Sequence, residues 1–276
     1  MRGDGKLAPP IPMQQRCYEQ YLEPYLNPEI DSGMHAYFLE QAFGAWWSCD
    51  IKKDDLKNLE MVIRICHHLY SSDKEEFIEM ASYLQEEGYE MTERSEQSRR
   101  SERKASDSED THEAAHAQLS LYKTQFENEF RLWATVPYVY AVKSHGLKSR
   151  AKSLRDAVNV GASTKFHGLK EVQVSSLGGL LSDLTFGFDN KIRNSGAGHD
   201  HWEITDDNLI ILRDIHPETG KERDKIVHTI ESLQSLSRDC NKSLWLMRNG
   251  FYIFMHNTPK FYSSLSRKKR MEDQRD

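Results

Sequence analysis

Apolar residues recur every three or four positions in four segments of the chain. The segments cover residues 119–136, 147–158, 177–192 and 233–254. This period matches the turn of an α-helix, so each segment predicts a helix with one apolar face. Four such faces can bury one another in a bundle. Thr229 is a residue type that caps helix N-termini, and it predicts where the last of these helices begins.

A different pattern lies between the third and fourth helical segments, over residues 202–228. Leu209 to Leu212 is a short apolar run of the kind that forms a strand. Asp206-Asp207-Asn208 precedes it and Pro217 to Gly220 follows it, and both are turn signals. The segment therefore predicts a small β-hairpin or meander inserted before the last helix.

The N-terminal half predicts further helices over residues 32–90. Ser72 followed by Glu75 is a capping-box pattern that opens a helix, and Gly88 is a candidate for its end. From Thr92 to Glu113 apolar residues almost vanish, while serines and charges of both signs alternate. Such a stretch cannot bury a face, so it is either a disordered linker or a solvated helical spacer.

These patterns predict a mainly α fold and a division into four parts. The parts are an N-terminal helical region (1–91), the charged linker or spacer (92–113), a helical bundle with the inserted hairpin (114–258) and a basic, polar tail (259–276).

Composition narrows the classes of function. The 276 residues are 29% charged and 38% hydrophobic, with a net charge of −6, so contact with nucleic acid requires a local basic patch. No apolar run reaches membrane-spanning length and no signal-peptide pattern begins the sequence, so we expect a cytoplasmic protein with no membrane association. The four cysteines form no CxxC pair, and we expect free thiols, no metal and no cofactor.

The segment KIRNSGAGHDHW, residues 191–202, carries the candidate chemistry. Arg193 and His199 would lie about 120° apart on an unbroken helix, but the glycines between them can end the helix and fold the two side chains together. Histidine can remove the proton from a ribose 2′-hydroxyl near neutral pH. Arginine can bind two oxygens of the phosphate on which negative charge then builds. The departing 5′-oxygen also needs an acid, which a second subunit of a symmetric dimer could supply.

The pattern Arg193-Asn194-x4-His199 resembles the signature of HEPN-domain ribonucleases, and the hairpin and long last helix resemble HEPN proteins of the abortive-infection type. The resemblance covers roughly residues 115–255. It implies a helical bundle that dimerises with facing motifs and cleaves RNA without a metal ion, as toxins and antiphage effectors do, with an antitoxin as a possible partner. In this reading Arg193 binds phosphate, His199 transfers protons and Asn194 orients the pair. Some HEPN domains bind RNA, nucleotides or proteins without cutting, which is the alternative function.

A basic segment precedes the motif. Lys148, Lys152 and Arg155 are expected on one face of the second helix, and a loop GASTKFHG follows with Lys165. This face is either an RNA-backbone track leading to Arg193 or an ordinary solvated surface. His201 lies close enough to the motif to assist in RNA binding, although a turn or strand-edge role is the alternative. A third possibility for the whole chain is a helical interaction protein in which the Arg–His spacing is accidental.

Overall fold

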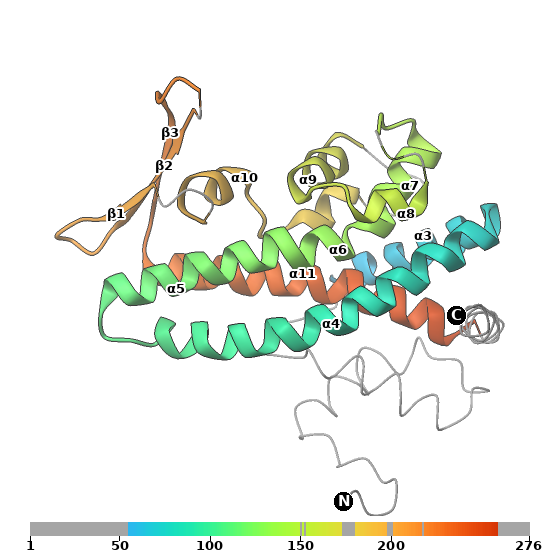
Figure 1. The fold of residues 1–276 in the computed structure, drawn as a ribbon, viewed down its shortest axis with the longest axis horizontal. Helices are drawn as coiled ribbons and strands as arrows, with labels where there is room; N and C mark the ends of the chain where they lie inside the picture. Colours follow the sequence, from blue (N-terminus) through green and yellow to red (C-terminus); the bar gives the residue numbers. More distant parts are fainter. Residues whose placement is uncertain are drawn as a thin grey trace, which may run out of the picture.

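The computed structural model shows a mainly helical protein with one small antiparallel sheet before the last helix, which confirms the predicted fold class (Figure 1). The structure describes residues 55–149, 151, 153–172, 180–197, 201–216 and 218–258. Expectations for residues 1–54 and for the C-terminal tail therefore lie outside the described residues. None of the helices that the structure describes combines membrane-spanning length with a sufficiently apolar sequence.

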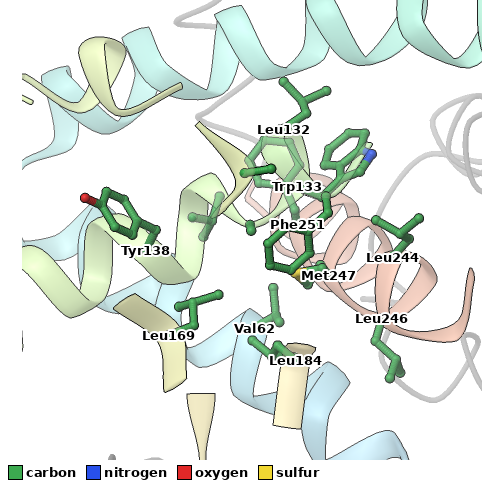
Figure 2. Close-up of a cluster of buried hydrophobic side chains, with 14 of the residues drawn as sticks. Val62, Leu132, Trp133, Tyr138, Leu169, Leu184, Leu244, Leu246, Met247 and Phe251 are labelled. Carbon is green, nitrogen blue, oxygen red and sulfur yellow. The ribbon is translucent and has the colours of Figure 1, made fainter. Parts of the chain in front are cut away.

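The centre of the fold is α11 (Ile230–His256), which packs along α3 (Leu56–Ser72). Every residue from Ser243 to His256 is buried, so this half of α11 is surrounded by other elements. Gly250 permits the close approach of α3, because a Cβ atom there would lie 2.7 Å from the Cβ of Val62. Figure 2 shows the resulting core, where Met247 and Phe251 of α11 meet Val62 and Trp133.

The charged segment is helical. It forms the second half of α4 (Lys74–Ser106), which turns back through a short loop into α5 (Thr111–Thr124) beside it (Figure 1). Two local predictions were wrong. The N-cap of α4 is Asp73, whose side chain accepts from the backbone N–H of Glu76, and not Ser72. Gly88 does not end the helix but makes room for Trp133, whose ring would lie 2.9 Å from an added Cβ.

The first and last apolar stripes are confirmed as helices. The first comprises α5, a π-helical segment η4 (Gln125–Phe130), α6 (Arg131–Trp133) and α7 (Thr135–His145). The last is α11, and Thr229 is its N-cap, with its side chain accepting from the N–H of Ser232.

The second and third stripes are shorter than predicted. Among the described residues of 147–158, only α8 (Leu154–Val158) is helical, and Ser153 caps its start. The stripe at 177–192 contains a 3₁₀ segment η5 (Leu181–Thr185), a turn at Gly187, and α10 (Asn190–Ile192). Gly187 has φ +81° and lies against the backbone of α11, where a side chain would overlap Cys240. The expected GASTKFHG loop is instead part of helix α9 (Ala162–Glu171).

The sheet is a meander of order β1-β2-β3, as the turn signals predicted. Its strands are β1 (Trp202–Ile204), β2 (Ile210–Ile215) and β3 (Glu222–His228), all antiparallel. Asn208, with φ 58°, lies in the first turn. Ile210 and Leu212 are fully buried, while from Arg223 onward β3 alternates between exposed and half-buried residues. The sheet stands beside the N-terminal half of α5, at one end of the molecule (Figure 1).

Candidate functional site

The motif begins on a π-helical turn, η6 (Arg193–Ala197), that continues directly from α10. Asp189 caps α10 by accepting from the N–H of Lys191. Ser195 is fully buried and its hydroxyl donates to the carbonyl of Lys191 at 2.6 Å, while its own carbonyl accepts from the N–H of His201 at 3.0 Å. The turn packs on α5 and β2. Sequence reasoning predicted a simple helix end, and π-helical turns of this kind often occur at functional sites.

Arg193 points from η6 toward the helix that contains η4. Its Nε pairs with the carboxylate of Glu127, and its Nη1 donates to Oδ1 of Asn194 at 2.9 Å. Nη2 makes no hydrogen bond to any residue that the structure describes. The side chain of Arg193 is 32% exposed, and that of Glu127 is 30% exposed. The guanidinium is thus held from two directions while part of its donor edge stays accessible.

Glu127 is the site residue that sequence reasoning missed. It lies in the first apolar stripe, between Phe126 and Phe130, which are fully buried. Its position on the polar side of a helix is common to many glutamates. Its pairing with Arg193 depends on how two distant segments pack, and no local pattern encodes that contact.

Oδ1 of Asn194 accepts from Arg193, and the orienting role of Asn194 toward His199 stays a prediction. His199 lies outside the described residues, and so does Lys152. His201 is half-buried directly before β1, and its backbone is fixed on both sides, because its carbonyl also accepts from the N–H of Arg213 at 2.9 Å. His201 thus lies immediately before a strand, and its assistance in RNA binding stays a prediction.

Two residues of the predicted basic face, Lys148 and Arg155, lie in the described part of the chain. Lys148 is exposed, and Arg155 is exposed with its guanidinium 3.6 Å from Glu79 of α4 and above the ring of Tyr83. These two residues share no contact with the Arg193 site in the described structure. The track toward the motif therefore stays a prediction for Lys148 and Arg155.

Lys165 requires a correction, because it is fully buried and cannot contact an RNA backbone. Its ammonium donates to Oγ1 of Thr135 at 2.7 Å, to the carbonyl of Val158 at 3.1 Å and to the carbonyl of Arg131. Burial, and then the charge of Arg131, lower the pKa of Lys165 well below its ordinary value. Lys165 joins α9 to the ends of α6 and α8 and has a structural role.

Among the described residues no three His, Cys, Asp or Glu side chains gather as a metal-ligand set. Cys66 and Cys240 are free thiols, as expected, and both are buried within the core. Comparison of the chain with protein-family models, curated proteins and solved structures gives no match. The interpretation of the site therefore depends on its geometry and on the motif.

Proposed function

We propose that the protein is a metal-independent endoribonuclease that acts in the cytoplasm as a homodimer, as a toxin or an antiphage defence effector. The resemblance of Arg193-Asn194-x4-His199 to the HEPN signature suggests this activity. The observation that carries the proposal is the state of Arg193, whose guanidinium is oriented by Glu127 and Asn194 and remains partly exposed. An arginine that is held in place but accessible is suited to binding phosphate oxygens.

In the proposed reaction His199 removes the proton of a ribose 2′-hydroxyl, and the 2′-oxygen attacks the adjacent phosphorus. The bond from phosphorus to the 5′-oxygen breaks, and a proton from the second subunit's histidine reaches the departing oxygen. The products are a 2′,3′-cyclic phosphate and a free 5′-hydroxyl. Arg193 stabilises the charge that develops on the phosphoryl oxygens, an interaction whose loss costs roughly 100- to 1000-fold in rate in comparable sites.

The test is cleavage of total RNA in EDTA by the wild type and by Arg193→Ala and His199→Ala. We expect breakdown by the wild type and a loss of at least about 100-fold in both variants. Arg213→Ala is a matched control, because Arg213 is 33% exposed and also pairs with glutamates, on the neighbouring sheet. Equal breakdown by all four proteins would identify a contaminating nuclease, and no breakdown by any would reject the activity.

One observation favours the alternative, a module that binds RNA, a nucleotide or a protein partner such as an antitoxin without cutting. The charge of Arg193 is already balanced by Glu127, so the pair is also compatible with a binding surface. RNA binding that persists without cleavage and weakens as salt increases would support this alternative.

A further inference from the structure

The start of α5 carries the sequence His112-Glu113-Ala114-Ala115-His116. Asp110 begins the helix, because its side chain accepts from the backbone N–H groups of His112 and Glu113. Residues four apart on a helix lie on the same face. Both histidines are exposed, and both face the indole of Trp202 in β1, with ring centroids at 4.8 Å for His112 and 6.4 Å for His116.

The imidazole nitrogens of this pair are available to a ligand. Neither ring donates or accepts a hydrogen bond with another described residue, although each has a ring contact with Trp202. Two other histidines differ in this respect. His68 is hydrogen-bonded to Ser144, and His228 to Ser232.

We propose that His112 and His116 bind a divalent transition-metal ion, with zinc as the ion that best suits two imidazoles. A helix that carries His-Glu-x-x-His presents both histidines to one ion, with zinc–nitrogen distances of about 2.0–2.1 Å. Imidazole favours Zn²⁺, Cu²⁺ and Ni²⁺ over Mg²⁺ and Ca²⁺, which favour oxygen ligands. Only two protein ligands come from the described residues, so the remaining positions of the ion face solvent and hold water.

Glu113 takes a separate part in this segment. Its Oε2 accepts from the hydroxyl of Ser108 at 2.7 Å, which ties the loop before α5 to the first turn of the helix. The site therefore uses the two histidines as ligands and leaves Glu113 in its structural contact. Replacement of Glu113 by Gln is expected to preserve the metal site.

The metal site is independent of the proposed nuclease, which works in EDTA. Zinc binding is measured by calorimetric titration of the metal-free full-length protein with ZnCl₂. We expect one site whose affinity falls at least tenfold in His112→Ala and in His116→Ala, and is unchanged in Glu113→Gln. His145→Ala is the matched control, because His145 is exposed on a helix end beside Tyr140 but has no histidine one turn away.

A second readout locates the ion. Cu²⁺ at this site should quench the fluorescence of Trp202, and the quenching should be absent in Trp202→Phe and in His116→Ala. Circular dichroism confirms that each variant is folded. Zinc affinity that is the same in the wild type and both histidine variants would overturn the proposal, and so would an absence of zinc binding by the wild type.

Discussion

The contacts of Arg193 orient its guanidinium group more than they stabilise the fold. The Arg193–Glu127 pair is about one-third exposed on both sides, and ion pairs of this exposure contribute about 0.2–1 kcal/mol to folding. A carboxylate on Nε and an amide oxygen on Nη1 nevertheless restrict the rotation of the guanidinium. If Arg193 binds phosphate, Glu127 is the residue that fixes its direction.

Substitution of Glu127 tests this orienting role through its effect on the rate of RNA cleavage. We expect Glu127→Ala to lower kcat for RNA cleavage by about 100-fold, which is the cost of a displacement of about 1 Å. Glu127→Gln should lose less, because its amide oxygen can still accept from Nε. Glu222→Gln, which alters the equivalent contact of Arg213, should leave cleavage unchanged. Faster cleavage by Glu127→Ala would show instead that Glu127 blocks the site.

Lys165 predicts a pH dependence of stability. Its pKa in the folded protein is lowered, while in the unfolded chain it is near the ordinary value of about 10.4. Between these two values the unfolded chain binds more protons, so stability rises with pH by up to about 1.4 kcal/mol per pH unit. The wild type is therefore expected to lose stability as pH falls toward the pKa that Lys165 has in the folded protein.

The measurement is urea unfolding of the wild type and of Lys165→Met at several pH values from 7 to 9.5. We expect the unfolding free energy of the wild type to rise with pH relative to that of Lys165→Met. Lys148→Met serves as the surface control, because Lys148 is exposed. A difference that does not change with pH would mean that Lys165 stays protonated on its three oxygen acceptors.

At this scale the sequence supplied candidates but not partners. Arg193 and Asn194 stand out because they are adjacent in a motif, and the structure brings their side chains together. Lys165 was misplaced because a lysine in a glycine-flanked polar segment is typical of a surface loop, and only the packing of α9 shows that it is buried. No site was predicted at His112 and His116, and their contact with Trp202 depends on how β1 lies beside α5.

Among the elements, the contact between α3 and α11 determines how closely the core can pack. A glycine inside a helix normally destabilises that helix by about 0.5–1 kcal/mol relative to an alanine. Here an added methyl group would lie 2.7 Å from the Cβ of Val62 and 3.1 Å from the carbonyl oxygen of Leu59. Neither the backbone of α3 nor that of α11 can move away without disturbing the packing of the other helix.

Gly250→Ala is therefore expected to destabilise the protein by about 1–3 kcal/mol, in spite of the better helix propensity of alanine. The check is denaturant unfolding of Gly250→Ala, Val62→Gly and the double variant. The double variant should be more stable than the sum of the single effects allows, because Val62→Gly removes both the Cβ and the Cγ1 atom that the new methyl group would meet. Additive effects would argue against a close contact at this point.

Periodicity predicted the elements that are long and regular. The stripes that became α5 and α11 lie on continuous helices, and Thr229 marked the start of α11 correctly. The stripe at 177–192 has the same spacing but is interrupted, because Gly187 adopts a left-handed conformation against α11. The error at Gly88 in α4 has a similar origin, since this glycine makes room for the ring of Trp133 and does not end the helix.

The residues that the structure describes share one hydrophobic core. It includes Leu59 and Phe77 from the N-terminal helices as well as Phe130 and Phe254 from beyond the charged segment. The composition of residues 92–113 predicted a disordered linker or a solvated helical spacer between two parts of the chain. The structure shows helix from Thr92 to Ser106, as in the second alternative, and the apolar first half of α4 lies in the shared core. A polar stretch can thus be the second half of a helix whose apolar residues lie in its first half.

A single core predicts a single unfolding transition. Circular dichroism and tryptophan fluorescence of the full chain should change together in denaturant, since small cooperative domains unfold in one step. A fragment beginning at residue 107 should bind a hydrophobic dye and unfold without cooperativity, because α11 would lose α3 and the core half of α4. Two separate transitions, or a stably folded fragment, would support two independent domains.

The central place of α11 has a consequence for synthesis of the protein. Gly250 is added to the growing chain about 190 residues after Val62, which takes roughly 10 to 40 s at bacterial or eukaryotic translation rates. During that interval α3 can pack on α4 and α7 but not on α11, so part of its apolar side stays exposed. The nascent chain therefore exposes an apolar surface while it is still attached to the ribosome. We expect chaperones that bind apolar segments to associate with it until α11 emerges from the exit tunnel.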